Sequence, residues 1–314
     1  MLEQILEGKI RHNYSFGKTT RFGVGGKVRC FFIARTEDAL VAAIKLAHTK
    51  SWPMVIVGEG TNLVVSDGSI GCFVIRNKIS GIKRLSRNSY EIGAGENWTK
   101  LVALFNKQGL GGVEKMYGVP GSAGGAVVGN AGCYGQEIKN VVAGVKVFDG
   151  KKVKWLKNKQ CRFDYRSSIF KELGGIAILR VRLSFARANP LLLVGESKKI
   201  FKIRSNKFPS NIKCAGSYFK NIILDSLSGD VRRRIVNEFK DKIRGGRLAA
   251  ATLIESVGMK GTKIGTVKIA DYHGNLIINM GNGKTRDVIK LSRQVKDRVR
   301  KAFNIELEEE VRII

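Results

Sequence analysis

Two glycine-rich segments, residues 58–62 and 118–135, contain the residue types of this chain that are best suited to bind a phosphorylated ligand. Glycine allows main-chain N–H groups to approach a ligand closely and to form concave nests for anions. A single loop of this kind is most simply a tight turn. Two loops of this density favour ligand binding, and they suit a long cofactor with a pyrophosphate bridge that lies across the strands.

The familiar nucleotide-binding motifs are absent. Gly283-Lys284-Thr285 resembles the end of a P-loop, but Ile278 stands where that motif needs its first glycine. Gly58-Glu59-Gly60 lacks the third glycine of a dinucleotide-binding fingerprint, and a strand-like run follows it instead of a helix. The three histidines and five cysteines are scattered without a C-x-x-C pair, so the sequence predicts no metal site, no hydrolase triad and no disulfide framework.

The elements that position these loops are predicted from the spacing of apolar residues. Thr36 and Asp230 are candidate N-caps, and the apolar alternation of residues 176–185 is typical of a half-buried strand. The expected helices cover 36–50, 98–108, 230–243, 247–257 and 285–303, and the expected strands cover 55–57, 63–65, 72–75, 144–149 and 176–185. The composition changes near Ala188-Asn189-Pro190, which predicts a domain boundary there.

The charge balance leaves three interpretations open. The chain has 314 residues with 56 Lys and Arg against 26 Asp and Glu, a formal net charge of +30. Such an excess is compatible with nucleic-acid binding, with anionic small molecules, or with a lysine-rich surface that has no single target. No apolar run reaches the roughly 18 residues of a membrane span, and the sequence starts without a basic and then apolar leader. We therefore expect a cytoplasmic globular protein without a membrane partner.

Several motifs that occur in a fixed order along nearly the whole chain make the sequence recognisable. They are Thr20-Arg21-Phe22-Gly23-Val24-Gly25-Gly26, residues 58–67, residues 118–135, Tyr165-Arg166-Ser167-Ser168, Gly216-Ser217-Tyr218-Phe219-Lys220-Asn221, residues 253–261 and Leu307-Glu308-Glu309-Glu310-Val311-Arg312. With these motifs the chain resembles the UDP-N-acetylenolpyruvoylglucosamine reductase (UDP-N-acetylmuramate dehydrogenase) family. The interval between Arg166 and Ser217 is short, which is similar to the subtype that lacks an extra substrate-closing loop.

The resemblance implies an α+β fold. An FAD-binding domain of the vanillyl-alcohol-oxidase type, made of two α/β subdomains, would be followed by a smaller α/β substrate-binding domain. The expected divisions are 1–80, 81–189 and 190–314, and the last residues would return to the active site. The implied cofactors are FAD and NADPH, and the implied substrate is UDP-N-acetylglucosamine enolpyruvate. No nucleic acid and no obligate protein partner are expected.

The implied reaction is the reduction of an enolpyruvyl C=C in peptidoglycan precursor synthesis, with hydride delivered from flavin N5. Negative charge then builds up as an enolate, which needs cationic or hydrogen-bonding groups and a positioned acid. By resemblance, Ser217 is the proton donor, while Arg166 and Glu310 stabilise the enolate. A planar guanidinium suits a carboxylate and stays charged throughout. Outside these motifs, the three residues would be read as a turn serine, a surface arginine and part of an acidic tail.

The resemblance also assigns residues to the two ligands. The substrate-binding residues it implies are Tyr165, Lys220, Asn221 and Arg312. The cofactor-binding residues it implies are Gly58, Glu59, Gly60, Thr61, Asn62, Gly118, Pro120, Gly121, Ser122, Gly124, Gly125, Asn130 and Gly132. The chain departs from the family pattern in three places: Glu309 and Ile222 stand where the family has proline, and residues 229–243 look added or altered in length.

Two other functions compete with this interpretation. Sugar oxidases and dehydrogenases share the flavin fold, but they often tether the flavin to a histidine near the first glycine loop. No histidine lies between His48 and His273, which counts against them. A nucleic-acid-binding protein would interleave stacking aromatics with its basic residues. The basic helix expected at 285–303 has no such aromatic residue before its last position, so this alternative is weaker.

Overall fold

The computed structural model describes residues 6, 8–209 and 211–314. The chain divides into two compact units, and each is described by itself. The first unit comprises the residues up to Tyr14 together with Val28–Gly60 and Ser69–Asn206. The second comprises Ser15–Lys27, Thr61–Gly68 and Lys207–Ile314. The chain therefore crosses between the units several times, and the predicted divisions near residues 80 and 189 remain predictions.

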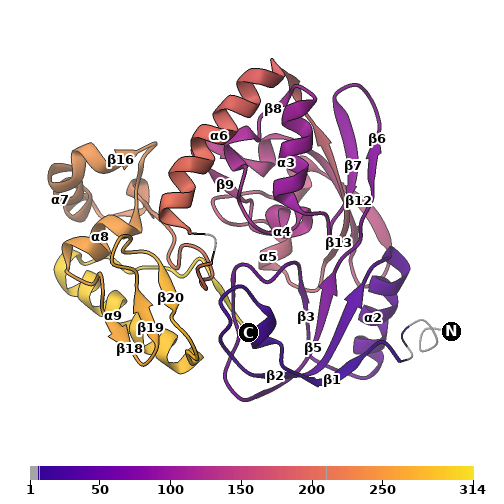
Figure 1. Cartoon of the computed structure of the whole chain (residues 1–314), viewed down its shortest axis with the longest axis horizontal. Helices are drawn as coiled ribbons and strands as arrows, with labels where there is room; N and C mark the ends of the chain where they lie inside the picture. The colour runs from indigo at the N-terminus through magenta and orange to yellow at the C-terminus, as the bar shows by residue number, and fades with distance from the viewer. Residues whose placement is uncertain (1–5, 7, 210) are drawn as a thin grey trace. The chain divides into compact units, whose positions relative to one another are not determined.

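A four-stranded sheet with a covering helix forms one part of the first unit (Figure 1). Its strand order is β1 (Arg11–Tyr14), β2 (Lys27–Ala34), β5 (Ser69–Asn77) and β3 (Met54–Val57). β3 and β5 run parallel, and α2 (Glu37–Thr49) buries Leu40 and Ile44 in the same core as Phe73. The predicted N-cap is confirmed, because the Thr36 hydroxyl accepts a hydrogen bond from the Ala39 N–H at 3.1 Å.

A five-stranded antiparallel sheet forms the other part of the first unit. Its strand order is β12 (Val153–Lys157), β11 (Val142–Phe148), β13 (Ala177–Ser184), β7 (Ser89–Gly93) and β6 (Ile82–Arg84). α3 (Trp98–Lys107) and the short α4 (Ala123–Val128) contribute Leu101, Phe105 and Val127 to its core. The half-buried pattern predicted for 176–185 is confirmed in β13, where Leu179 and Val181 are buried and Arg180 lies at an intermediate position.

Short elements complete the first unit. They are β8 (Leu110–Gly111) paired with β14 (Ala186–Arg187), β9 (Gly132–Cys133) paired with β10 (Gln136–Glu137), α5 (Ile169–Glu172) and α6 (Pro190–Lys207). The 18-residue α6 was not among the expected helices. It begins immediately after Asn189, whose side chain accepts a hydrogen bond from the Leu191 N–H at 2.9 Å. The predicted boundary at residues 188–190 thus coincides with the start of a helix.

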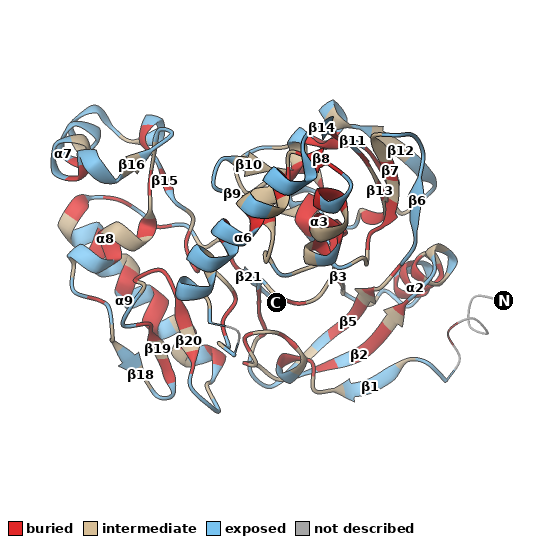
Figure 2. Cartoon of the chain, turned by 45° about the horizontal axis from the view of Figure 1, so that its top comes forward, coloured by how far each residue is buried: buried red, intermediate tan, exposed pale blue. Residues whose placement is uncertain are grey.

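Helices and three small sheets build the second unit. The sheets are β15 (Ile222–Ile223), β17 (Arg247–Leu248) and β16 (Ile243–Arg244); β18 (Lys263–Ile264), β19 (Val267–Ile269) and β20 (Ile277–Asn279); and β4 (Leu63–Val64) with β21 (Arg312–Ile313). The helices are α7 (Gly229–Phe239), α8 (Ala250–Ser256) and α9 (Thr285–Phe303). Figure 2 shows the buried stripe of α9, which contains Val288, Leu291, Val295 and Val299. The helix predicted at 285–303 is confirmed.

Two helix predictions in the second unit need correction. The helix predicted at 230–243 ends at Phe239 and is followed by a 3-10 turn and β16, and Asp230 lies inside it while Ser228 is the N-cap. The helix predicted at 247–257 begins only at Ala250, because Arg247 and Leu248 pair with β15 and β16. No helix among the described residues is long and apolar enough to cross a membrane.

Candidate active site

The two glycine-rich segments meet inside the first unit at Gly58 and Ser122. A Cβ atom on Gly58 would lie 2.4 Å from the Ser122 hydroxyl oxygen, so any side chain there would displace its neighbour. Gly60 and Gly118 have φ angles of +68° and +78°, a region that other residues rarely adopt. Close approach of Ser122 to Gly58 and of Phe201 to Gly118, together with left-handed backbone at Gly60 and Gly118, therefore explains these glycines.

Residues 94–98 fix the second segment. Three main-chain hydrogen bonds connect them, from Trp98 to the carbonyl of Gly121 at 3.0 Å, from Ala123 to that of Glu96 at 2.9 Å, and from Gly124 to that of Ala94 at 2.8 Å. The Ser122 hydroxyl, at the N-cap of α4, accepts from the Gly125 N–H at 3.3 Å. Main-chain hydrogen bonds to residues 94–98 therefore fix the loop without the help of a ligand.

Glu59 and Asn130, two of the predicted cofactor-binding residues, already bind other residues of the first unit through their side chains. The Glu59 carboxylate binds the Lys78 ammonium at 2.5 Å. Asn130, which is 1% exposed, donates to the carbonyl of Asp164 at 2.9 Å and accepts from the Lys139 N–H at 3.3 Å. These two residues would therefore meet a cofactor through main-chain atoms.

Arg166 lies at the tip of a tight turn in the first unit. Asp164 and Ser167 exchange main-chain hydrogen bonds of 3.1 Å on either side of it, and Arg166 has a positive φ of +54°. Its guanidinium donates from Nη1 to the carbonyl of Gly132 at 2.9 Å and lies 5.7 Å from the centre of the Tyr165 ring. Because Asn130 bonds to Asp164, the glycine-rich segment and the arginine turn form one connected structure.

A second arginine, which was not predicted from the sequence, lies near the hairpin of β9 and β10. Arg204, on α6, and Arg166 both stabilise the thiolate form of Cys133, although burial is the larger effect and raises the pKa of this thiol. The β9–β10 hairpin therefore has two guanidinium groups near it, which suits an anionic ligand. Arg204 lies outside the recognised motifs, and only its placement on an unpredicted helix reveals it.

In the second unit, residues 218–220 and 308–310 pair next to Ser217 through an isolated antiparallel bridge between Phe219 and Glu309, called the strand pair below. Lys220 N–H donates to the carbonyl of Glu308 at 2.9 Å, and Glu310 N–H donates to the carbonyl of Tyr218 at 2.8 Å. Gly216, at φ +87°, allows the sharp turn that leads into this pairing. Ser217 therefore directly precedes the residue whose carbonyl accepts the hydrogen bond of Glu310, another predicted catalytic residue.

Asn275 holds the same strand from its other edge. Its main-chain carbonyl accepts from the Tyr218 N–H at 3.0 Å, and its side chain both accepts from the Phe219 N–H and donates to the Phe219 carbonyl, each at 2.8 Å. Asn275 is 3% exposed, and its own N–H donates to Nδ1 of His273 at 3.2 Å. This bond requires a His273 ring that is unprotonated at Nδ1, and burial lowers the pKa of this ring.

The remaining predicted residues of the second unit surround this strand pair. Asn62 donates to the carbonyl of Glu310 at 3.1 Å and accepts from the Arg312 N–H at 3.0 Å. The Lys220 ammonium binds the Glu308 carboxylate at 2.7 Å. Thr61 and Asn221 also belong to this unit, whereas the other predicted cofactor contacts, Arg166 and Tyr165 belong to the first.

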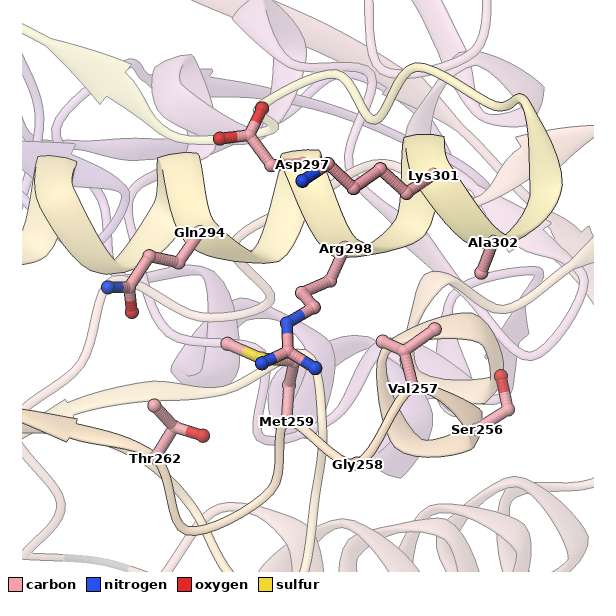
Figure 3. A pocket seen from close by; sticks show the side chains of 10 residues that line it. All are labelled: Ser256, Val257, Gly258, Met259, Thr262, Gln294, Asp297, Arg298, Lys301 and Ala302. Carbon is pink, nitrogen blue, oxygen red and sulfur yellow. The ribbon is translucent and has the colours of Figure 1, made fainter.

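A groove of about 920 Å³ lies elsewhere in the second unit, between the end of α8 and the side of α9. Figure 3 shows the Arg298 guanidinium reaching across it towards Met259 and Thr262. None of the predicted site residues lines this groove. The candidate residues of the second unit therefore lie at the strand pair, and most of those of the first unit lie at the glycine-rich loops.

Two known families match separate parts of the chain. The family described as "UDP-N-acetylenolpyruvoylglucosamine reductase, C-terminal domain" matches residues 208–314, and an FAD binding domain family matches residues 28–154. Two curated reductases of this name are similar to the chain. That of Solibacter usitatus is 39% identical over 94% of this chain and 93% of its own, and that of Fervidobacterium nodosum is 33% identical over 96% and 90%.

A solved structure agrees with these matches. The crystal structure of the corresponding reductase from Thermus caldophilus has a TM-score of 0.74 and 26% identity, and the match covers 97% of this chain and 98% of that one. These findings confirm the predicted fold class, an α+β chain with an FAD-binding domain of the vanillyl-alcohol-oxidase type followed by a smaller substrate-binding domain.

Replacing Asn275 by alanine is expected to destabilise the second unit by about 2–4 kcal/mol, because the buried N–H and carbonyl of Phe219 would both lose their partner. Urea unfolding of the purified protein measures the change. Asn282→Ala, at an exposed position, is the matched control and should cost less than about 0.5 kcal/mol. We call the two hydrogen bonds of the Asn275 side chain to Phe219 the clamp on Phe219. Equal stability of the two variants would show that this clamp is weak.

Acid is expected to weaken the same clamp through His273. Burial lowers the pKa of the folded His273 ring below the ordinary value of 6.5. As the pH falls through about 6.5, the unfolded chain takes up the proton first, so the free energy of unfolding decreases. His273→Gln removes this titration, and its unfolding free energy should fall less steeply between about pH 7 and pH 5. Parallel pH profiles for the two proteins would contradict the assignment.

Proposed function

Because the chain belongs to the UDP-N-acetylenolpyruvoylglucosamine reductase family, we propose that it reduces the enolpyruvyl C=C of UDP-N-acetylglucosamine enolpyruvate with NADPH. The product is UDP-N-acetylmuramate, a precursor of peptidoglycan. The observation that carries this proposal is the pairing of residues 218–220 with 308–310, since it joins the motif that contains Ser217 to the motif that contains Glu310. We also propose that the activity is cytoplasmic, in keeping with five free cysteines.

FAD is the cofactor that the first unit fits best. A Cβ atom on Gly58 would lie 2.4 Å from the Ser122 hydroxyl oxygen, and one on Gly124 would lie 2.9 Å from the Ala94 Cβ, so only glycine allows the loops to pack this closely. Main-chain N–H groups of these loops would hold the phosphates. When bound, the flavin supplies the hydride for the reduction. The contacts proposed for it remain those of the glycine loops: residues 58–62, Gly118, residues 120–122, Gly124, Gly125, Asn130 and Gly132.

Ser217 is the proposed proton donor to the enolate carbon. A serine hydroxyl is a weak acid, so the donation needs a fixed geometry, which the paired strands and Asn275 supply. Glu310 is proposed to stabilise the enolate as a hydrogen-bonding neighbour. Arg166 adds a permanent positive charge for the carboxylate that gains electron density, and its bond to Gly132 fixes the direction of its guanidinium.

The substrate would be held by Lys220, Asn221, Arg312 and Tyr165. Lys220 is paired with the largely exposed Glu308, so a diphosphate would replace this carboxylate as its partner. An exposed pair of this kind contributes about 0–1 kcal/mol, so the replacement costs little. The main-chain N–H of Arg312 donates to the carbonyl of Asn62, whose side chain bonds to Glu310, so a second cation lies on the segment that pairs with residues 218–220.

FAD uptake tests the cofactor assignment. The purified protein should bind FAD and show a flavin spectrum, and Gly58→Ala should weaken binding at least about tenfold, because its methyl group would displace Ser122. Gly71→Ala is the matched control, since nothing lies within 4 Å of the added carbon. A colourless protein that refuses FAD would end the reductase proposal.

Ser217→Ala tests the proton donor. NADPH should still bleach the flavin of this variant at the wild-type rate, because this step needs no proton from Ser217. The return of flavin colour on adding the enolpyruvyl substrate should slow by about 100-fold or more, the usual contribution of a positioned acid. Stopped-flow absorbance separates the two steps. Equal rates for wild type and variant in the second step would remove Ser217 from the mechanism.

A further inference from the structure

Glu309 occupies a special position in the strand pair of the second unit. It lies opposite Phe219, and the two hydrogen bonds that flank this pair are made by its neighbours, Glu308 and Glu310. In an antiparallel pair of this type, the N–H and carbonyl of the central residue point away from the partner strand. The two hydrogen bonds therefore fix Glu308 and Glu310, whereas the N–H and carbonyl of Glu309 take no part in the pairing.

The side chain of Glu309 is held instead. Its carboxylate binds the Lys296 ammonium at 2.8 Å, and the two side chains are 30% and 29% exposed. Lys296 lies between Val295 and Val299 on α9, both of which are buried in the core, so it extends from a rigid support. Ser292, one helical turn before Lys296, lies near the Tyr218 hydroxyl and opposes the rise in the pKa of Tyr218 that burial causes.

We propose that Lys296 is a positioning residue for Glu310. Consecutive side chains of an extended strand point to opposite faces, so a carboxylate of Glu309 that is pinned to α9 turns the next side chain away from α9. The inference rests on the proposed function, in which Glu310 acts at the enolate. Lys296 does not touch the reacting atoms; it acts through Glu309 and through the main chain that the two glutamates share.

A proline at position 309 offers a way to separate this role from a general loss of charge. Its ring fixes φ near −65° without any side-chain partner, and it removes an N–H that the strand pair does not use. The variants are therefore Lys296→Met and the double variant Lys296→Met with Glu309→Pro. Lys290→Met, at an exposed position of the same helix, is the matched control.

The first measurement is hydrogen exchange of the Glu310 amide in the purified protein without substrate. Lys296→Met should speed exchange about two- to fivefold, the range expected for a half-exposed ion pair, and the double variant should restore protection. Added salt should speed exchange in the wild type and leave the double variant unchanged. Wild-type exchange in Lys296→Met would overturn the proposal.

The second measurement is turnover with the enolpyruvyl substrate. Lys296→Met should lower kcat about two- to fivefold with little change in KM, and the double variant should regain the wild-type kcat. If the double variant regained wild-type protection of the Glu310 amide but kept a low kcat, the positioning role would be overturned in favour of a direct effect of the Lys296 charge. A wild type without reductase activity would overturn the proposed function, while the exchange series would still decide whether Lys296 fixes Glu310.

Discussion

The clamp on residues 218–220 is the constraint on which the site of the second unit depends. One edge of this short strand pairs with residues 308–310, and the other edge is closed by the buried amide of Asn275. Neither partner is near in sequence, since Asn275 is 56 residues from Phe219. Such distant contacts carry an entropic cost of loop closure, so they form only because the core around α9 holds both partners in place.

Sequence patterns predicted the elements with strong apolar periodicity and missed those without it. α2, α3 and α9 were found because each buries one stripe of side chains. α6 was missed because the adjacent Leu191 and Leu192 are exposed while Leu193 is buried, so no single apolar face marks the helix. Motif resemblance supplied Ser217, Glu310 and Arg166, but Asn275 and Arg204 act through distant contacts that no local spacing indicates.

The positive charge of the chain is partly used inside the second unit. Glu306, Glu308 and Glu309 could have been a solvated acidic tail, yet each lies against a cation: Arg300, Lys220 and Lys296 respectively. Two of these cations belong to the basic face of α9. These three pairs are neutral, so the net charge of +30 lies outside them. That net charge produces a field that attracts anions and weakens with salt.

The departure from the family pattern after Asn221 can be reconciled with an intact site. Ile222 starts β15, and the segment that follows folds back through β16 and β17, so the chain returns to the point where it left. The side-chain oxygen of Asn221 accepts a hydrogen bond of 3.4 Å from the N–H of Ala250, the first residue of α8, which bridges the two ends of this segment. A proline at position 222 would lack the N–H of a strand residue, so isoleucine suits the added pairing. The β15–β17 pairing and the bond between Asn221 and Ala250 join the two ends of this segment. The length and sequence of the residues between these ends can therefore vary without moving residues 217–221.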